Sequence, residues 1–303
     1  MMNVFEFLGL APDYRKEGKV VQMVKNLEEV PESKIEYPLM GQIKYDGVYC
    51  MLVVSEDNIG TFGRTGKRLS NTVGLELEYA NLKPGVYIGE LCLPGTSLEV
   101  LSGIVNPNRT KPVEEELYTY YEDNKEMHFH DYLTIEEFIS GRSDKKYIHR
   151  LSALIVHRLP YVDFILIDSP ADLEDYAKSC IEAGHEGVVL KQDSGWEAGH
   201  KGWRSMKRVR RVEYDLLCVE SEEGKGKYKG KVANLIFQWR DGDTIKAMLG
   251  KNYTHEDAES MFTGDFDPIG SIFTVYGLQD SSKGKIRLPK VGELRHDKHE
   301  PDF

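Results

Sequence analysis

The chain has 303 residues, of which 40% are hydrophobic and 29% charged, and its formal net charge at pH 7 is −11. This composition excludes a disordered or collagen-like chain, and the length indicates about two domains at about 100–200 residues each. No apolar run approaches the roughly 18 residues of a membrane span, and residues 1–6 lack the basic start and apolar stretch of a signal peptide. We therefore expect neither membrane association nor secretion.

The four cysteines are isolated in the sequence, without a Cys-x-x-Cys pair, at Cys50, Cys92, Cys180 and Cys218. A structural zinc site is not expected from such spacing, and scattered thiols fit a reducing cytosol. The acidic net charge by itself disfavours a nucleic-acid partner. Positive charge is nevertheless concentrated in residues 201–211 and 225–231, and a local basic patch can bind phosphate on an acidic protein.

Residues 13–30 are predicted to form a helix, because valines and Leu27 recur there at helical spacing. After Pro38 the pattern becomes β-rich, and two such runs, 42–45 and 48–54, flank Asp46-Gly47, which predicts a hairpin. Residues 111–125, acidic and rich in tyrosine, are interpreted as a surface insertion. Further strands are predicted at 85–93, 128–133, 164–168 and 187–191, and helices at 135–141, 147–156 and 171–183. This irregular mixture predicts an α+β fold.

The pattern of the sequence changes after Arg211. From Tyr214 to Tyr276 the sequence alternates short β-rich runs with Asp-Gly and glycine-rich turns, and it offers one short helix at 255–261. That pattern is typical of a small all-β barrel. We therefore predict two domains, 1–211 and 212–303.

Several short motifs carry chemical groups, but each one alone also fits an ordinary surface feature. Lys44 stands beside an Asp-Gly turn where Gly47 permits close backbone approach to a ligand, although an exposed hairpin lysine is equally consistent. The loop 63–67 joins glycines to Arg64 and Lys67, a combination that holds phosphate or simply faces water. Glu90 and Glu186 are carboxylates on predicted strands, suited to Mg²⁺ or a ribose hydroxyl or merely to solvent. The basic run 203–211 and the charged segment 295–298 are open to the same two interpretations.

Order and spacing remove that ambiguity. Lys44-Tyr45-Asp46-Gly47, Arg64, Glu90, Glu186-Gly187, Lys207 and Arg295-x-Asp297-Lys298 closely resemble the ordered motifs of the ATP-dependent DNA ligases. These enzymes, with RNA ligases and mRNA capping enzymes, form the covalent nucleotidyltransferases. The resemblance covers about residues 38–300, and residues 214–231 are similar to the opening strands of the ligase OB-fold. It implies an adenylation domain of antiparallel sheets and helices followed by an OB-fold barrel, at the size of the compact viral and phage ligases.

The resemblance also implies a three-step reaction. Lys44 attacks the α-phosphate of ATP and forms lysyl-AMP, AMP passes to the 5′-phosphate of a DNA nick, and the 3′-hydroxyl then displaces AMP. The implied cofactors are ATP and Mg²⁺ (or Mn²⁺), and the implied partner is nicked duplex DNA bound by a monomer. The barrel is expected to close for lysine adenylation and to reopen for DNA.

The implied roles follow the motif positions. Gln42, Asp46, Gly47, Glu90 and His130 belong to the nucleotide pocket, with Gln42 at the adenine amino group and Glu90 at the ribose. Glu186, together with Glu90, serves the metal. The phosphate-binding set is Lys191, Arg204 and Lys207, completed by Arg295, Asp297 and Lys298 over the pyrophosphate. The DNA-binding set is Arg64 at the nick phosphate, with Lys67, Lys225, Lys227, Lys229 and Lys231.

Three positions depart from the family pattern. Tyr49 stands where the first motif usually ends in arginine, and Ser205 replaces the first lysine of a Lys-x-Lys pair, where Arg204 is a candidate for compensation. His130 holds the place of the aromatic residue that stacks on adenine. Phe129 could fill that role only after a one-residue shift, which would turn the other strand face inward.

Three other kinds of protein share part of this pattern. An RNA ligase or a capping guanylyltransferase shares the motifs, but the Gly-Lys-rich opening of the barrel and Arg295-x-Asp297-Lys298 favour the DNA enzyme. A non-catalytic OB-fold module that binds single strands would not need Lys44 or Glu186. An NAD-dependent ligase is disfavoured because its cysteine zinc module and extra domains are missing from the sequence.

Overall fold

A computed structural model describes residues 2–280 and 284–303, and the chain divides into two compact units, Met1–Val209 and Arg210–Phe303. The first unit contains two main β-sheets with helices, and the second contains a closed β-barrel. The predicted α+β fold class with a C-terminal barrel is therefore confirmed.

The first main sheet of unit 1 has five strands in the order β1-β11-β9-β2-β8. Its strands are β1 (Met23–Asn26), β2 (Leu39–Ile43), β8 (Phe164–Ile167), β9 (Gly187–Lys191) and β11 (Lys201–Val209). One face packs on helix α7 (Pro170–Glu182), because Leu39, Val188 and Leu190 are apolar and buried there. The alternate residues point to the other face, where the register pairs Gln42 with Val189 and Lys191 with Ser205.

The second main sheet has four strands in the order β4-β3-β5-β6. They are β3 (Val48–Val54), β4 (Ile59–Phe62), β5 (Gly85–Cys92) and β6 (Glu126–Leu133). Tyr49, Glu90 and His128 are direct neighbours across β3, β5 and β6. In β6 the register shifts between Phe129 and Asp131, so His130 is an extra residue, as in a β-bulge. The bulge re-aims the side chain of His130.

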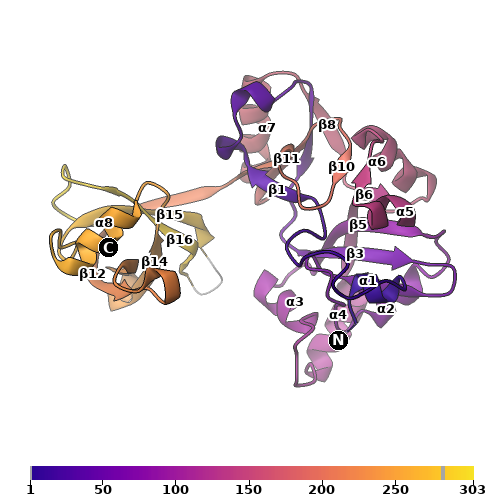
Figure 1. Cartoon of the computed structure of the whole chain (residues 1–303), viewed down its shortest axis with the longest axis horizontal. Helices are drawn as coiled ribbons and strands as arrows, with labels where there is room; N and C mark the ends of the chain where they lie inside the picture. Colours follow the sequence, from indigo (N-terminus) through magenta and orange to yellow (C-terminus); the bar gives the residue numbers. More distant parts are fainter. Residues whose placement is uncertain (1, 281–283) are drawn as a thin grey trace. The chain divides into compact units, whose positions relative to one another are not determined.

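Helices and one small ribbon complete unit 1 (Figure 1). The ribbon pairs β7 (Arg142–Ser143) with β10 (Trp196–Glu197). Helix α6 packs directly on β6, and Leu151 and Leu154 from it enter the core beneath that sheet. The helices are α1 (Val4–Phe7), α2 (Val73–Glu78), α3 (Leu98–Ile104), α4 (Glu115–Asn124), α5 (Ile135–Ser140) and α6 (Tyr147–Val156).

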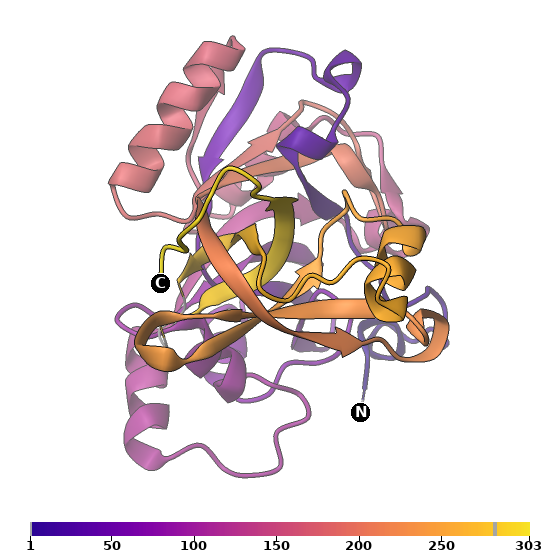
Figure 2. The same cartoon turned by 90° about the vertical axis from the view of Figure 1, so that its left-hand side faces the viewer.

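Unit 2 is a five-stranded barrel closed in the order β12-β13-β14-β16-β15 (Figure 2). Its strands are β12 (Arg211–Glu223), β13 (Val232–Gln238), β14 (Thr244–Leu249), β15 (Ile272–Asp280) and β16 (Ile286–Leu294), and helix α8 (His255–Thr263) lies between β14 and β15. The barrel has its own core around Leu235, Phe237 and Phe273, which are fully buried. A separate core explains why this segment folds as a compact unit.

Most predicted elements appear near their expected bounds. Strands β5, β6, β8 and β9 and helices α5, α6, α7 and α8 all lie where the patterns placed them. The prediction of residues 111–125 as a surface insertion is partly wrong, because α4 forms there and Tyr121 is fully buried.

The predicted helix over 13–30 is wrong. The segment enters as an irregular chain, with Gly18 at φ +44°, and then forms β1 in parallel pairing with β11. Val20 and Val21 are buried in the core of unit 1. The segment pairs with a strand far along the sequence, and this pairing overrides the local helical spacing. The β-branched Val24 in β1 suits a strand.

The predicted hairpin around Asp46-Gly47 is also wrong. β2 pairs with β8 and β9, whereas β3 pairs with β4 and β5, so the Asp-Gly turn joins two different sheets. A Cβ atom on Gly47 would stand 2.5 Å from the Leu91 carbonyl oxygen and 2.7 Å from Glu90 Cγ. The glycine therefore permits the second sheet to approach the crossing chain.

Gly187 offers a test of how tightly the first sheet is built. Its φ is +145°, and an added Cβ would collide with the Arg208 carbonyl oxygen, with Val209 Cα at 2.7 Å. Gly184 also has positive φ, +92°, but nothing lies within 4 Å of its Cβ position. We expect Gly187→Ala to lower the free energy of unfolding by about 1–3 kcal/mol more than the control Gly184→Ala, because only the former is overpacked. Denaturant titration measures both, and equal losses would contradict the close packing seen here.

Candidate active site

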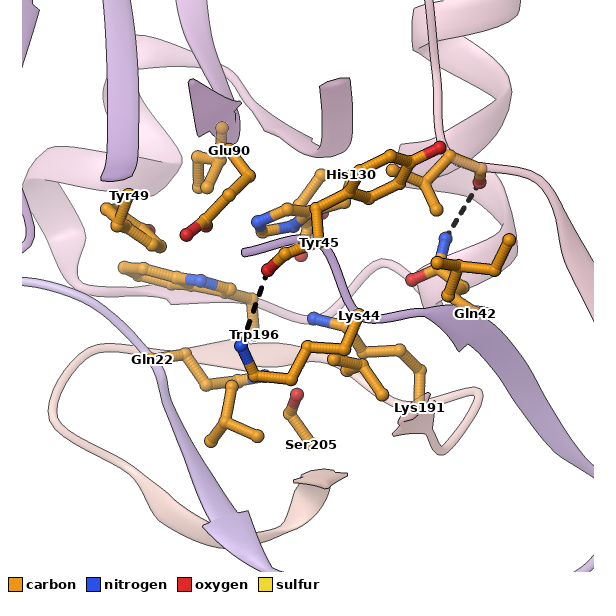
Figure 3. Close-up of a pocket in the computed structure, with 16 residues that line it drawn as sticks. Gln22, Gln42, Lys44, Tyr45, Tyr49, Glu90, His130, Lys191, Trp196 and Ser205 are labelled. Atoms are coloured by element: carbon orange, nitrogen blue, oxygen red, sulfur yellow. Dashed lines mark hydrogen bonds between the residues drawn. The ribbon is translucent and has the colours of Figure 1, made fainter. Parts of the chain in front are cut away.

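A cavity of about 730 Å³, including its open mouth, lies within unit 1 (Figure 3). Apolar side chains such as Ile43, Val162 and Val189 form part of the wall. The polar and aromatic lining residues are Gln22, Gln42, Lys44, Tyr45, Tyr49, Glu90, His130, Asp131, Lys191, Trp196 and Ser205. An apolar cavity with a few convergent polar groups is the expected form of a small-molecule site.

Lys44 follows β2 directly, and two interactions join it to the start of β9. Its backbone N–H donates to the Gly187 carbonyl oxygen at 2.9 Å, and its Nζ lies 2.6 Å from Glu186 Oε2. Nζ also donates to the Tyr45 carbonyl oxygen at 3.4 Å (Figure 3). The Lys44 side chain is 21% exposed and that of Glu186 7%. The fold thus unites an amine and a carboxylate that the sequence separates by 142 residues, and leaves the amine accessible from the cavity.

Glu90 lies in the cavity wall on β5, near Lys44. Burial raises the pKa of Glu90 to about 7; the Lys44 ammonium opposes this increase, whereas Glu186 and Asp46 add to it. Arg64 is close enough to lower the pKa of Glu90 slightly. Near neutral pH this carboxyl group therefore divides between its acid and carboxylate forms.

Lys191 and Ser205 form a cross-strand pair on the face of the first sheet that lines the cavity. The Lys191 amine lies 5.3 Å from the Tyr147 ring centroid, and no carboxylate of the described residues pairs with it. Burial lowers the pKa of Lys191 to about 8, although the Asp131 carboxylate opposes this. Ser205 Oγ is buried without a hydrogen-bond partner among the described residues. A buried cation and an unused hydroxyl make this row suited to an anionic ligand.

His130 enters the cavity from the bulge in β6, opposite that row (Figure 3). Its Nδ1 atom is buried and finds no hydrogen-bond partner in the described part of the chain. Burial and the Lys191 ammonium lower the pKa of His130 to about 3, so the imidazole is neutral at pH 7. Phe129 instead packs in the core beside Tyr79 and Tyr87. The structure thus brings His130, and not Phe129, to the cavity.

A network of hydrogen bonds fixes the inner end of the cavity. Gln42 is buried; its Nε2 donates to the Val162 carbonyl oxygen at 2.8 Å, and its Oε1 accepts from the Tyr147 hydroxyl at 2.9 Å. Asp131 is paired with Arg150 at 2.8 Å, and both side chains are at most 3% exposed. Buried polar groups with satisfied partners hold a cavity wall rigidly.

Other predicted residues lie near the cavity but outside its lining. Lys207 is close enough to Lys44 that burial and the Lys44 charge both lower the pKa of Lys207. Arg64 is exposed on the loop after β4 and is close to both Glu90 and Lys207. Asp46 is exposed, and Gly47 packs against β5.

The expected compensation by Arg204 for Ser205 is not supported. Adjacent strand residues point to opposite faces, and the Arg204 guanidinium contacts the Gly195 carbonyl oxygen and Glu197 and stacks on Trp203. Lys191, beside Ser205, is a cation that does line the cavity.

The predicted residues of unit 2 form groups of their own. Arg295 forms ion pairs with Asp215 and Asp297. Lys298 also pairs with Asp215. Lys225, Lys227, Lys229 and Lys231 belong to the turn between β12 and β13. Within that turn, the Lys227 amine lies over the Tyr228 ring, and Lys231 pairs with Glu259 at 2.8 Å.

Sequence reasoning missed several residues of the cavity. Trp196 and Gln22 line it, and the stack of Tyr45 on His128, with centroids 3.9 Å apart, lies next to Lys44. For Trp196 the sequence did offer a signal, because an aromatic residue directly after a glycine, in segment 193–196, is a candidate for contact with a ligand. Gln22 had no signal, because its segment was predicted to be a helix.

Comparisons with known proteins show what the chain is similar to. Residues 223–295 match the family described as "DNA ligase OB-like domain". A probable DNA ligase of Saccharopolyspora erythraea is 27% identical over 238 residues, which cover 75% of this chain and 43% of that protein. This chain therefore spans less than half the length of that curated relative.

Solved structures show the same fold. A Lig E DNA ligase superposes with a TM-score of 0.69 at 16% identity, over 91% of this chain and 98% of that one. The ATP-dependent DNA ligase of bacteriophage T7, solved in complex with ATP, gives a TM-score of 0.52 at 15% identity, over 91% and 99%. The chain resembles the ATP-dependent DNA ligases. Its fold is an α+β unit followed by a closed five-stranded barrel, and the OB-like match falls on that barrel.

Two features are absent from the described part of the chain. Within residues 2–280 and 284–303, no helix combines the length and apolar character needed to cross a bilayer. In the same described part of the chain, no group of three or more His, Cys, Asp or Glu side chains is arranged to hold a metal ion.

The raised pKa of Glu90 predicts a pH-dependent contribution to ligand binding. If Glu90 accepts hydrogen bonds from a ribose, the carboxylate form binds more strongly than the acid, because a charged acceptor strengthens the bond. AMP affinity of the unchanged protein should exceed that of Glu90→Gln by about tenfold at pH 8, and this ratio should shrink as the pH falls through 7. Comparing the two proteins at each pH cancels the ionisation of AMP itself. An exposed carboxylate variant, Asp123→Asn, should show no such trend; a constant ratio for Glu90→Gln would contradict the assignment.

Proposed function

We propose that this chain is an ATP-dependent DNA ligase that seals nicks between a 3′-hydroxyl and a 5′-phosphate in duplex DNA. The observation that carries the proposal is the Lys44 amine, accessible from the cavity and 2.6 Å from the Glu186 carboxylate. Around it lie Glu90, Lys191 and Lys207, which the ligase motifs assign to a nucleotide. The similarity of both units to DNA ligases supports the same conclusion.

In the first step Lys44 Nζ attacks the α-phosphorus of ATP. A P–N bond forms, the bridging P–O bond to the β-phosphate breaks, and pyrophosphate leaves with the electron pair. Because the reference pKa of lysine is near 10.4, Nζ must lose a proton before attack, and Glu186 lies within proton-transfer distance of it. Cations positioned around the phosphate supply most of the catalysis in such transfers, and Lys191 and Lys207 are the proposed cations.

The later steps move AMP onto DNA. The 5′-phosphate of the nick attacks the lysyl-AMP phosphorus, so the P–N bond breaks and a pyrophosphate linkage forms. The 3′-hydroxyl then attacks the 5′-phosphate, a phosphodiester forms, and AMP leaves. Arg64, exposed beside Glu90, is the proposed contact for the nick phosphate.

The residues present fit a magnesium requirement. Glu90 and Glu186 are close enough to influence each other electrostatically, and Mg²⁺ is commonly held by one or two carboxylates together with substrate phosphates. These two carboxylates would hold it, and it would neutralise the charge that develops on the phosphates. A site of this kind needs no cluster of three protein ligands.

The remaining nucleotide contacts are assigned by position in the cavity. Glu90 is proposed for the ribose, and Gln42, at the inner end, for adenine. His130 is proposed to stack on the base as a neutral ring, which agrees with its lowered pKa. Asp46 and Gly47 shape the turn that carries Lys44, and Arg295, Asp297 and Lys298 are assigned to the pyrophosphate during lysine adenylation.

Lys44→Ala should abolish covalent labelling of the protein by ATP, because the first motif assigns the nucleophile to Lys44. Sealing of a chemically pre-adenylated nick should partly survive, since that substrate needs only the last step. Lys178→Ala, which removes an exposed lysine on α7, is the matched control and should label normally. Labelling is measured with radioactive ATP or GTP and Mg²⁺: AMP bound to Lys44→Ala would disprove the nucleophile, and labelling by GTP alone would favour a capping guanylyltransferase.

DNA binding should depend on the lysine turn of the barrel. Each phosphate that a cation neutralises adds roughly 0.9 to the slope of log affinity against log salt. Changing Lys225, Lys227, Lys229 and Lys231 to Ala should therefore weaken nicked-duplex binding and flatten the slope, while lysyl-AMP formation stays near normal. A control with the same charge change replaces exposed lysines of unit 1, Lys34, Lys145, Lys146 and Lys178. Loss of adenylation with an unchanged slope would assign the turn to the nucleotide instead.

A further inference from the structure

Arg295 is surrounded by two carboxylates within unit 2. Its Nη1 lies 2.8 Å from both oxygens of Asp215, while its Nε and Nη2 donate to the two oxygens of Asp297 at 2.9 and 2.7 Å. Lys298 adds a second cation, 3.2 Å from Asp215. Asp215 lies in β12, 80 residues before Arg295. It belongs to the segment 214–231 that resembles the opening of the ligase OB-fold, but the sequence assigned it no role.

The two carboxylates differ in burial. The Asp215 side chain is 11% exposed, whereas that of Asp297 is 66% exposed. Asp297 can exchange its hydrogen bonds with water at little cost, but Asp215 cannot leave Arg295 without stranding a buried charge. Asp215 is therefore the fixed partner, and Asp297 the replaceable one.

The position of Asp215 is itself set by the barrel. Its Oδ1 accepts from the Thr274 hydroxyl at 2.9 Å across the β12–β15 pair. Its backbone N–H donates to Asp302 Oδ2, and its carbonyl oxygen accepts from the Asp302 N–H, both at 2.8 Å. The carboxylate is thus bonded to Thr274, and the backbone that carries it is bonded to Asp302, so Asp215 has little freedom to move.

These contacts leave one edge of the guanidinium available for exchange. A guanidinium has five N–H donors, and Asp215 occupies the Nη1 end. The opposite Nε/Nη2 edge, now covered by the exposed Asp297, is the forked edge that matches a phosphate.

We propose that Asp215 is a positioning residue for Arg295: it fixes the Nη1 end of the guanidinium so that the Nε/Nη2 edge is presented to a phosphate of ATP in exchange for Asp297. This inference rests on the proposed function. It adds a residue of the first barrel strand to those that lysine adenylation requires, acting only through Arg295.

The test is a double-mutant cycle in the full chain. Asp215→Asn keeps the size of the side chain but removes the charge that holds Arg295. We expect lysyl-AMP formation from ATP to fall by about 10- to 100-fold, the loss typical of a misplaced catalytic group, while sealing of a pre-adenylated nick stays close to that of the unchanged protein. In the Arg295→Ala background, Asp215→Asn should cause no further loss. Thr274→Val, which removes another partner of Asp215 but leaves the ion pair, is the matched control.

The outcomes separate the possibilities. A further loss from Asp215→Asn in the Arg295→Ala background, or an equal fall in both reactions, would show that Asp215 only stabilises the barrel. A faster adenylation would show that it restrains Arg295, and both results overturn the proposal. If thermal melting shows that Asp215→Asn does not fold, Asp215→Glu, which keeps the charge and displaces it by one methylene, goes through the same cycle with the same expected losses. Absence of lysyl-AMP in the unchanged protein would overturn the proposed function as well.

Discussion

The candidate site depends on the ion pair between Lys44 and Glu186. The lysine follows β2 and the glutamate precedes β9, and these two strands are neighbours in one sheet. Their backbones are joined at the same point by the bond from Lys44 N–H to the Gly187 carbonyl oxygen. The sheet register therefore holds the amine and its carboxylate together, and β3 leaves for the second sheet directly after them. An incoming ligand meets a reactive group whose position is set by backbone pairing.

Burial gives the groups around that pair their chemical character. It raises the pKa of Glu90 to about 7 and lowers the pKa values of Lys191 and His130 to about 8 and 3. All three shifts disfavour charge, because the cavity wall solvates ions poorly. A nucleotide phosphate would supply the counter-charge that Lys191 lacks. A cavity of this kind favours an anionic ligand over an empty, water-filled state.

Several cations outside the cavity are paired with carboxylates within the same unit. Lys67 pairs with Glu17, Lys231 with Glu259, and Arg295 with Asp215 and Asp297. This pairing is how a chain of net charge −11 can carry a set of phosphate-binding side chains without strong long-range attraction to every polyanion. At these three positions a phosphate must replace a carboxylate, so it binds where its geometry is better and not merely where charge is present.

The sequence by itself determined the α+β fold class, the barrel, and the elements β5, β6, β8, β9, α5, α6, α7 and α8, because those signals are local in period and turn chemistry. The ordered motifs also predicted Lys44, Glu90, Glu186 and Lys191 as site residues before any contact was known. Only the tertiary structure decided that 13–30 contributes a parallel strand and that Asp46-Gly47 joins two sheets, since strand partners distant in sequence override local propensity. It also decided that a bulge turns His130 inward, that Lys191 stands beside Ser205, and that Asp215 meets Arg295. Each of these depends on register between distant strands, which no local pattern encodes.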